Sequence, residues 1–175
     1  MLRVRRTGME IDSRALRNAL GRFPTGVSVV TSGAPGLEYG MTCQSFTSLS
    51  LDPPLVLVCV ANGAGILPML EETGAFTVNI LSAAQESLSG FFASSSRPPP
   101  PHQFDDVPHH PGVTGTARIA GATTVFDCRL HALLDGGDHR IVVGEVAAFE
   151  HTGDDPPILF FEGAYRTLAP AGGDA

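Results

Sequence analysis

The sequence contains no lysine, so all 11 of its basic residues are arginines. Without a lysine amine, the chain cannot form a Schiff base with a carbonyl substrate, which excludes that class of covalent catalysis. The formal net charge is −7 over 175 residues. Surfaces that bind nucleic acids need clustered positive charge, so this composition argues against a nucleic-acid partner.

Long apolar runs and cysteine pairs are also scarce. No apolar run approaches the length that crosses a bilayer, and the basic start MLRVRRTGM lacks the apolar stretch of a signal peptide. Cys43, Cys59 and Cys128 are odd in number and have no CxxC spacing, which predicts free thiols. We therefore expect a soluble, cytoplasmic protein without a membrane partner.

The length and the absence of internal repeats predict a single domain. We expect a disordered tail over residues 1–11, the domain over residues 12–168 and a C-terminal tail over residues 169–175. Met1 and Met9 are both candidates for the first residue.

Hydrophobic periodicity predicts a mainly β fold with two or three short flanking helices. One helix is expected to start at Asp12 or Ser13, one spans residues 66–73, and one follows a Ser82/Gln85 capping box and ends near Phe92. About seven strands suggest a closed antiparallel barrel, which would leave no exposed sheet edges. The strands are expected at 27–31, 55–60, 76–80, 124–134, 139–150, 158–161 and 165–168.

Two segments are expected to be loops. Residues 42–50 are rich in hydroxyls and run through Pro53 and Pro54 into strand 55–60, which is expected to be buried on both faces. A polar loop on a rigid strand is a typical place for a small-molecule site. Four consecutive prolines within residues 94–103 predict a surface excursion.

Two further patterns suggest sites that their surroundings argue against. Residues 62–65, with the sequence NGAG, look like the start of a dinucleotide fingerprint, but Pro68 replaces the third glycine. The histidines and aspartates between residues 102 and 110 are interrupted by proline, so we expect a solvated loop and no metal site.

Four segments resemble the flavin reductase-like family in sequence and order, over about residues 12–168. They are FPTGVSVVTS (23–32), GMTCQSFTSLSLDPPLVLVCV (40–60), FTVNILSAAQESLSGFFASSSR (76–97) and GGDHRIVVGEV (136–146). The resemblance implies a closed antiparallel split β-barrel of the Greek-key type that binds FMN or FAD and reduces it with NADH or NADPH. It further implies a homodimer, in which dimerisation completes the flavin cleft, and release of reduced flavin to a separate monooxygenase component.

The resemblance also implies which residues bind the flavin. Those expected along the ring are Met41, Thr42, Cys43, Gln44 and Ser45, and those near the ribityl and phosphate end are Ser48, Leu49 and Ser50. The family's turn at residues 62–65 often carries Arg and Ser side chains that hold the phosphate, and this chain lacks them. Backbone N–H groups of Asn62, Gly63 and Gly65, before the next helix, would substitute, or the flavin is held weakly. Phe92 and Tyr165 fit either the core or the site.

His139 lies in a Gly-Asp-His motif that the resemblance places beside the flavin and the nicotinamide. From the residues alone, a single histidine at the start of a strand is an exposed or capping residue. Because the flavin itself accepts the hydride, we expect His139 to position the reactants, with Arg140 on the opposite face of its strand. Two alternatives stay open: a non-catalytic flavin-binding or storage protein, and an oxygenase that acts directly on an organic substrate.

Overall fold

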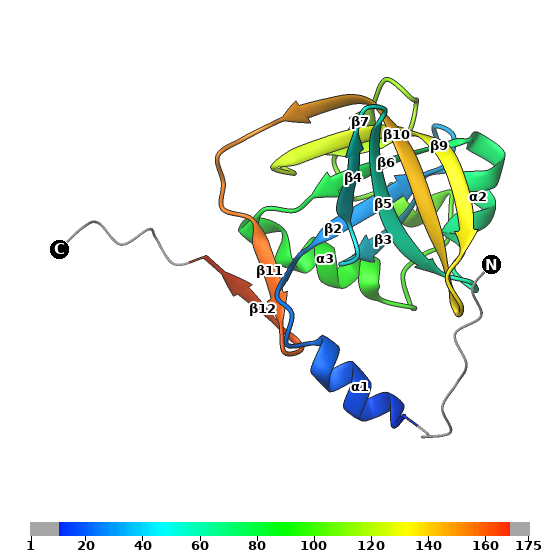
Figure 1. Cartoon of the computed structure of the whole chain (residues 1–175). Helices are drawn as coiled ribbons and strands as arrows, with labels where there is room; N and C mark the ends of the chain where they lie inside the picture. The colour runs from blue at the N-terminus through cyan, green and yellow to red at the C-terminus, as the bar shows by residue number, and fades with distance from the viewer. Residues whose placement is uncertain (1–10, 169–175) are drawn as a thin grey trace.

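The computed structural model describes residues 11–168. The expected tails at 1–11 and 169–175 and the alternative start at Met9 therefore fall almost wholly outside the described residues. The first element, α1 (Ser13–Leu20), begins where the sequence predicts. The Asp12 carboxylate caps it by accepting a hydrogen bond from the Arg14 N–H at 2.8 Å. None of the helix residues is buried, and α1 projects away from the main sheet (Figure 1).

A seven-stranded antiparallel sheet forms the body of the molecule. Its hydrogen-bonded order is β3 (Tyr39–Cys43), β2 (Ser28–Ser32), β6 (Ala75–Ile80), β9 (Thr124–Asp135), β10 (His139–His151), β5 (Pro54–Ala61) and β4 (Thr47–Leu51). β3 and β4 are thus the first and last strands of the sheet, although they are consecutive in the chain. The mainly β prediction is confirmed, and five of the predicted strands lie in this sheet.

Two smaller sheets and three α-helices complete the described fold. β1 (Thr25–Gly26), β11 (Ile158–Phe161) and β12 (Ala164–Thr167) form one small sheet, and β7 (His109–Pro111) pairs with β8 (Ala117–Ile119). α2 (Ile66–Thr73) ends at Gly74, whose φ of 61° is in the left-handed region. The predicted Ser82/Gln85 capping box is confirmed and opens the short 3₁₀ turn η1 (Ala83–Gln85), which leads into α3 (Glu86–Ala93). A second 3₁₀ turn, η2 (His102–Phe104), lies in the proline-rich segment.

The predicted polar loop at residues 42–50 is wrong. These residues are the end of β3, a turn at residues 44–46, and most of β4. β4 is an edge strand in which Thr47 and Ser48 are exposed and Ser50 is half-buried, while its backbone pairs with β5. The pattern of hydroxyls does not distinguish such an edge strand from a loop, because only one side of its backbone is paired.

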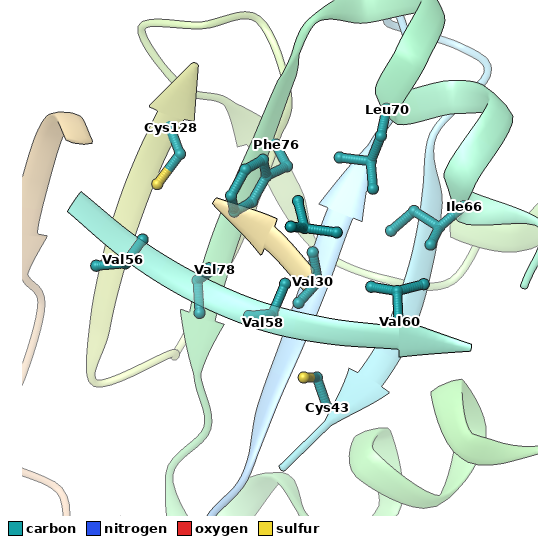
Figure 2. Packing of buried hydrophobic residues seen from close by; sticks show 11 residues of the cluster. Val30, Cys43, Val56, Val58, Val60, Ile66, Leu70, Phe76, Val78 and Cys128 are labelled. Atoms are coloured by element: carbon teal, nitrogen blue, oxygen red, sulfur yellow. The ribbon is translucent and has the colours of Figure 1, made fainter. Parts of the chain in front are cut away.

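Strand β5 is not buried on both faces. Val56, Val58 and Val60 are buried, whereas the alternate residues Leu55, Leu57 and Cys59 are only half-buried. The buried valines face Phe76 of β6 and the α2 residues Ile66 and Leu70, as Figure 2 shows. One face of β5 therefore packs into the core and the other stays partly open.

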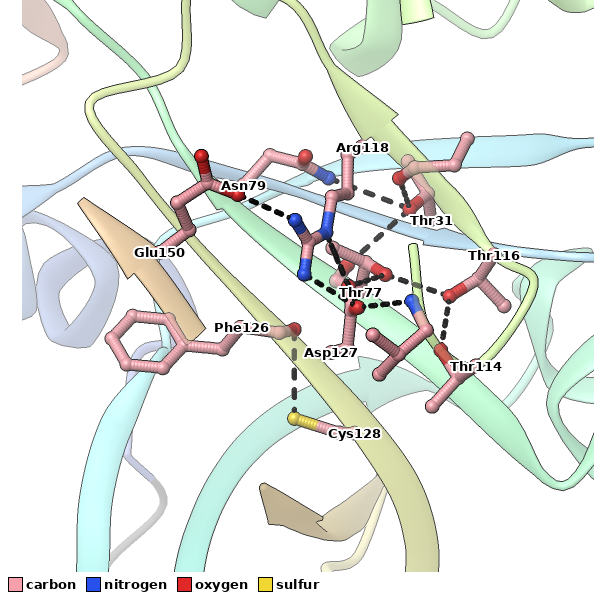
Figure 3. A network of polar contacts seen from close by, with 12 residues as sticks. Thr31, Thr77, Asn79, Thr114, Thr116, Arg118, Phe126, Asp127, Cys128 and Glu150 are labelled. Atoms are coloured by element: carbon pink, nitrogen blue, oxygen red, sulfur yellow. Dashed lines mark hydrogen bonds and ion pairs between the residues drawn. The ribbon is translucent and has the colours of Figure 1, made fainter. Parts of the chain in front are cut away.

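A buried ion pair joins β8 to β9 (Figure 3). The Arg118 guanidinium donates to the Asp127 carboxylate at 2.9 Å, and this hydrogen bond raises the pKa of Arg118. Asp127 is fully buried and also accepts hydrogen bonds from the Val113 N–H at 2.6 Å and from the Thr77 hydroxyl at 3.0 Å. Such full pairing offsets the cost of burying the carboxylate, so these residues hold the β7–β8 hairpin on the main sheet.

Candidate functional site

A cavity of about 680 Å³ opens between β3, the turn at residues 63–65, the end of α3 and the start of the proline-rich segment. It brings together six of the residues that the resemblance implies for flavin binding. These are Met41, Thr42, Gln44, Gly63, Gly65 and Phe92. The remaining wall residues are Tyr39, Ala64, Ala93, Ser95, Arg97, Pro98, Pro99 and Gln103.

Two polar side chains line the β3 side of the cavity, the hydroxyl of Thr42 and the amide of Gln44. The Thr42 hydroxyl donates to the Ser89 carbonyl oxygen of α3 at 2.7 Å, so it fixes α3 against β3. Gln44 is exposed at the start of the following turn, and its side chain forms no hydrogen bond with the described residues. Its amide is therefore free to contact a ligand.

Cys43 and Ser45 lie behind this wall and have structural contacts. Cys43 is buried in the core, and burial raises the pKa of its thiol. The Ser45 hydroxyl accepts from the Cys59 N–H at 2.7 Å and donates to the Cys59 carbonyl oxygen at 3.2 Å. These bonds attach the β3–β4 turn to β5, and neither residue lines the cavity.

Ser48, Leu49 and Ser50 lie on β4 at a distance from the cavity. Ser48 pairs with Val56 and Ser50 with Leu55, near the start of β5. The turn at residues 62–65 follows the opposite end of β5. The structure therefore does not bring these three residues together with the glycine turn within this chain.

Phe92 and Tyr165 differ in their relation to the cavity. Phe92 is 1% exposed and packs so closely on Gly40 that a Cβ there would lie 2.5 Å from its ring. Phe92 is thus a core residue with one edge in the cavity wall. The Tyr165 hydroxyl lies 2.9 Å from the Ser89 hydroxyl and its ring packs on Phe160, outside the cavity.

The Gly-Asp-His hairpin is attached to the glycine turn. The Asn62 side chain donates to the Gly137 carbonyl oxygen at 3.0 Å, and the Asn62 N–H donates to the Asp138 carbonyl oxygen at 3.0 Å. His139 pairs with Ala61 in the β10–β5 ladder. Its Nδ1 lies 2.7 Å from the Asp138 carboxylate, and this hydrogen bond lowers the pKa of Asp138.

His139 itself is 44% exposed at the side chain and lines none of the described cavities. Its neighbour Arg140 lines a different hollow on the other side of the turn, together with Glu71 and Asp135. His139 thus lies beside the end of β5 that leads into the turn at residues 62–65, and its role stays a prediction.

Sequence reasoning missed four polar residues of the cavity wall: Tyr39, Ser95, Arg97 and Gln103. Arg97 Nη2 donates to the Tyr39 hydroxyl at 2.8 Å, and its guanidinium carbon lies 5.2 Å from the Tyr39 ring centroid. Gln103 is buried and accepts from the Gly40 N–H at 2.6 Å. The segment 94–103 is therefore more than a surface excursion, and no periodic pattern in it indicates these contacts.

Comparisons with known proteins identify the family. The flavin reductase like domain model matches residues 20–169. The chain belongs to this family. It is 44% identical to the reductase component of 4-hydroxyphenylacetate 3-monooxygenase from Thermus thermophilus, over 88% of this chain and 95% of that protein. It is also 44% identical to an NADH-dependent FAD reductase from Streptomyces globisporus, over 91% of this chain and 87% of that protein.

A solved structure agrees with this assignment. The flavin reductase component BorF of a bacterial two-component tryptophan halogenase superposes with a TM-score of 0.86 at 40% identity. The match covers 91% of this chain and all of the BorF chain. Within residues 11–168, no helix is long and apolar enough to cross a membrane.

Proposed function

We propose that this chain is an NAD(P)H-dependent flavin reductase that supplies reduced FMN or FAD to a separate monooxygenase component. The observation that carries the proposal is the cavity at the end of the β3 and β5 strands, in a chain of the flavin reductase family. Its volume of about 680 Å³ suits a small-molecule ligand. Its wall combines apolar groups with one arginine. A flavin nucleotide has the complementary parts, an apolar ring and an anionic phosphate.

In this proposal the protein binds and orients the reactants. A bound flavin supplies the hydride acceptor, so the chain needs no acid or base for that step. Met41 and Phe92 offer apolar contacts to the ring, and Gln44 offers an amide to its polar edge. His139 positions the nicotinamide from the hairpin beside the glycine turn.

The test is reduction of FMN and of FAD by NADH and by NADPH, followed by stopped-flow absorbance. We expect the protein to accelerate at least one of the four pairs well above the uncatalysed rate. A non-catalytic flavin-storage protein is the second candidate, since residues 62–65 carry no charged side chain to hold a phosphate. Flavin binding without acceleration of any pair would favour storage and reject the reductase.

We further infer that the main sheet closes into a split barrel. Support comes from the Ser45 hydroxyl, which bonds to β5 from the turn that joins the two end strands β3 and β4. We also infer a homodimer, because α1 exposes apolar side chains that no other residue between 11 and 168 buries. A cytoplasmic location fits the three free cysteines and a nicotinamide reductant.

A further inference from the structure

Arg97 is a cation without a compensating anion. Among the described residues it forms no ion pair, and neither Asp nor Glu lines the cavity. Its Nε is buried and has no hydrogen-bond partner. Arg97 is the one charged side chain in the described cavity wall, in a chain whose net charge is −7. Nη1 donates to the Ser94 carbonyl oxygen at 2.5 Å, so the guanidinium has neutral partners only. A cation with no carboxylate beside it favours an anionic ligand in this cavity.

Tyr39 fixes this guanidinium beside the start of α2. Gly65 is the N-cap of α2, and a Cβ on Gly65 would lie 2.8 Å from the Tyr39 hydroxyl oxygen. The same hydroxyl accepts the hydrogen bond from Arg97 Nη2 at 2.8 Å. The arginine, the tyrosine hydroxyl and the helix N-terminus are therefore neighbours in one wall of the cavity.

The glycine turn adds backbone donors to this wall. Gly63 and Gly65 both line the cavity, and within the described residues neither N–H donates to a protein acceptor. The N-terminus of a helix attracts anions through such free N–H groups and through its dipole. The guanidinium and the free N–H groups together form a built donor set for a tetrahedral anion.

The opposite side of the same turn is a poorer place for an anion. Arg140 lies there and also has a buried Nε without a partner. Glu71 and Asp135 line that hollow, however, so two carboxylates share it with Arg140. An anionic ligand is therefore expected on the Arg97 side of the turn, where no described carboxylate lines the cavity.

We propose that Arg97 and the N-terminus of α2 bind the 5′-phosphate of the flavin. Arg97, from a segment more than thirty residues away in the chain, takes the place of the charged side chains that residues 62–65 lack. This assignment rests on the proposed flavin reductase function and adds the residue that selects a phosphorylated flavin. FMN and FAD share this phosphate, whereas riboflavin has none.

The test compares FMN with riboflavin in wild type and in Arg97→Gln, by the quenching of flavin fluorescence on titration with protein. We expect Arg97→Gln to raise the Kd for FMN about tenfold or more and to leave the Kd for riboflavin within about twofold, because only FMN carries the charge. Arg129→Gln, which removes an exposed charge from β9, is the matched control and should change neither value.

The outcomes separate the two claims. Equal changes for FMN and riboflavin in Arg97→Gln would give Arg97 a merely structural role and overturn the assignment. A selective loss of FMN binding in Arg140→Gln and not in Arg97→Gln would move the phosphate to the other side of the turn and overturn it as well. A wild type that binds neither flavin would reject the proposed function and the assignment together. Circular dichroism of each variant verifies that it is folded.

Discussion

His139 is the residue with the most direct expected effect on hydride transfer. If it positions the nicotinamide against the flavin, His139→Ala should slow flavin reduction by up to about a hundredfold, since a misplacement of about 1 Å can cost that much. Flavin affinity should stay within a few-fold. The rate of flavin bleaching after mixing with saturating NADH measures the step.

His151→Ala is the control for this variant. His151 also lies on β10, at the other end of the strand, and its side chain is 64% exposed. It should match wild type in rate and in affinity. Identical bleaching rates in wild type and His139→Ala would leave His139 as an exposed strand residue, as its exposure and its contact with Asp138 alone suggest.

Cys128 gives a prediction for alkaline pH. Burial raises the pKa of this thiol from 9.0 to about 12. The folded state therefore favours the protonated thiol, and the stability from this group is fully present below pH 9 and is lost as the pH rises toward 12. We expect the free energy of unfolding in urea to fall between pH 9 and 11, by at most about 1.4 kcal/mol per pH unit from this thiol.

The matched variant for that measurement is Cys128→Ala. It is expected to be less stable than wild type at pH 8, because it leaves a small cavity beside Phe76. Its stability should nevertheless depend less steeply on pH between 9 and 11. Parallel pH profiles for the two proteins would show that Cys128 titrates no differently in the folded and unfolded chains.

At the scale of elements, the turn between β3 and β4 separates two serines that look alike in the sequence. The Ser45 hydroxyl pairs with both backbone groups of Cys59, whereas Ser48 is exposed on β4. Ser45→Ala leaves the Cys59 N–H without its acceptor, so we expect a loss of about 1–3 kcal/mol in the free energy of unfolding. Ser48→Ala should stay within about 0.5 kcal/mol of wild type. Urea unfolding measures both, and equal stabilities would contradict the structural role of Ser45.

The same elements indicate which parts of the fold can be predicted from sequence. Strands β2, β6, β9 and β10 have central positions in the sheet, and their apolar runs identify them. β3 and β4 lie at the ends of the order, and β4 is mostly exposed, so their residues need not be apolar. Their polar composition therefore predicts a loop. An edge strand forms because its backbone pairs with the neighbouring strand, so its own side chains need not show an apolar pattern.

The candidate site was predictable only in part for a related reason. Met41, Thr42 and Gln44 follow from a contiguous motif, and the structure does place them in the cavity. Arg97 and Tyr39 are 58 positions apart, and their contact depends on the packing of α3 and the glycine turn against β3. Such long-range contacts carry no local pattern.

At the scale of the whole molecule, the exposed side chains of α1 need an explanation. Leu16 and Leu20 of α1 are 46% and 65% exposed, and Phe23, in the turn that follows the helix, is 75% exposed. The adjoining hollow, of about 690 Å³, is lined by Phe23, Phe46, Ile80 and Phe126. Figure 1 shows α1 projecting from the body of the molecule, and none of its residues is buried. A monomer rarely exposes so many large apolar groups together, so a second copy of the chain is the expected cover.

The homodimer can therefore be tested through α1. We expect wild type to sediment with the mass of two chains at micromolar concentration. Leu20→Glu should shift it toward the mass of one, because an unpaired carboxylate in an apolar interface is costly. The monomer should stay folded, since Leu20 is exposed in the single chain. Leu37→Glu, at a leucine that is 52% exposed between β2 and β3, is the control and should remain dimeric. A monomeric wild type, or a Leu20→Glu dimer as stable as wild type, would place the partner elsewhere or reject the dimer.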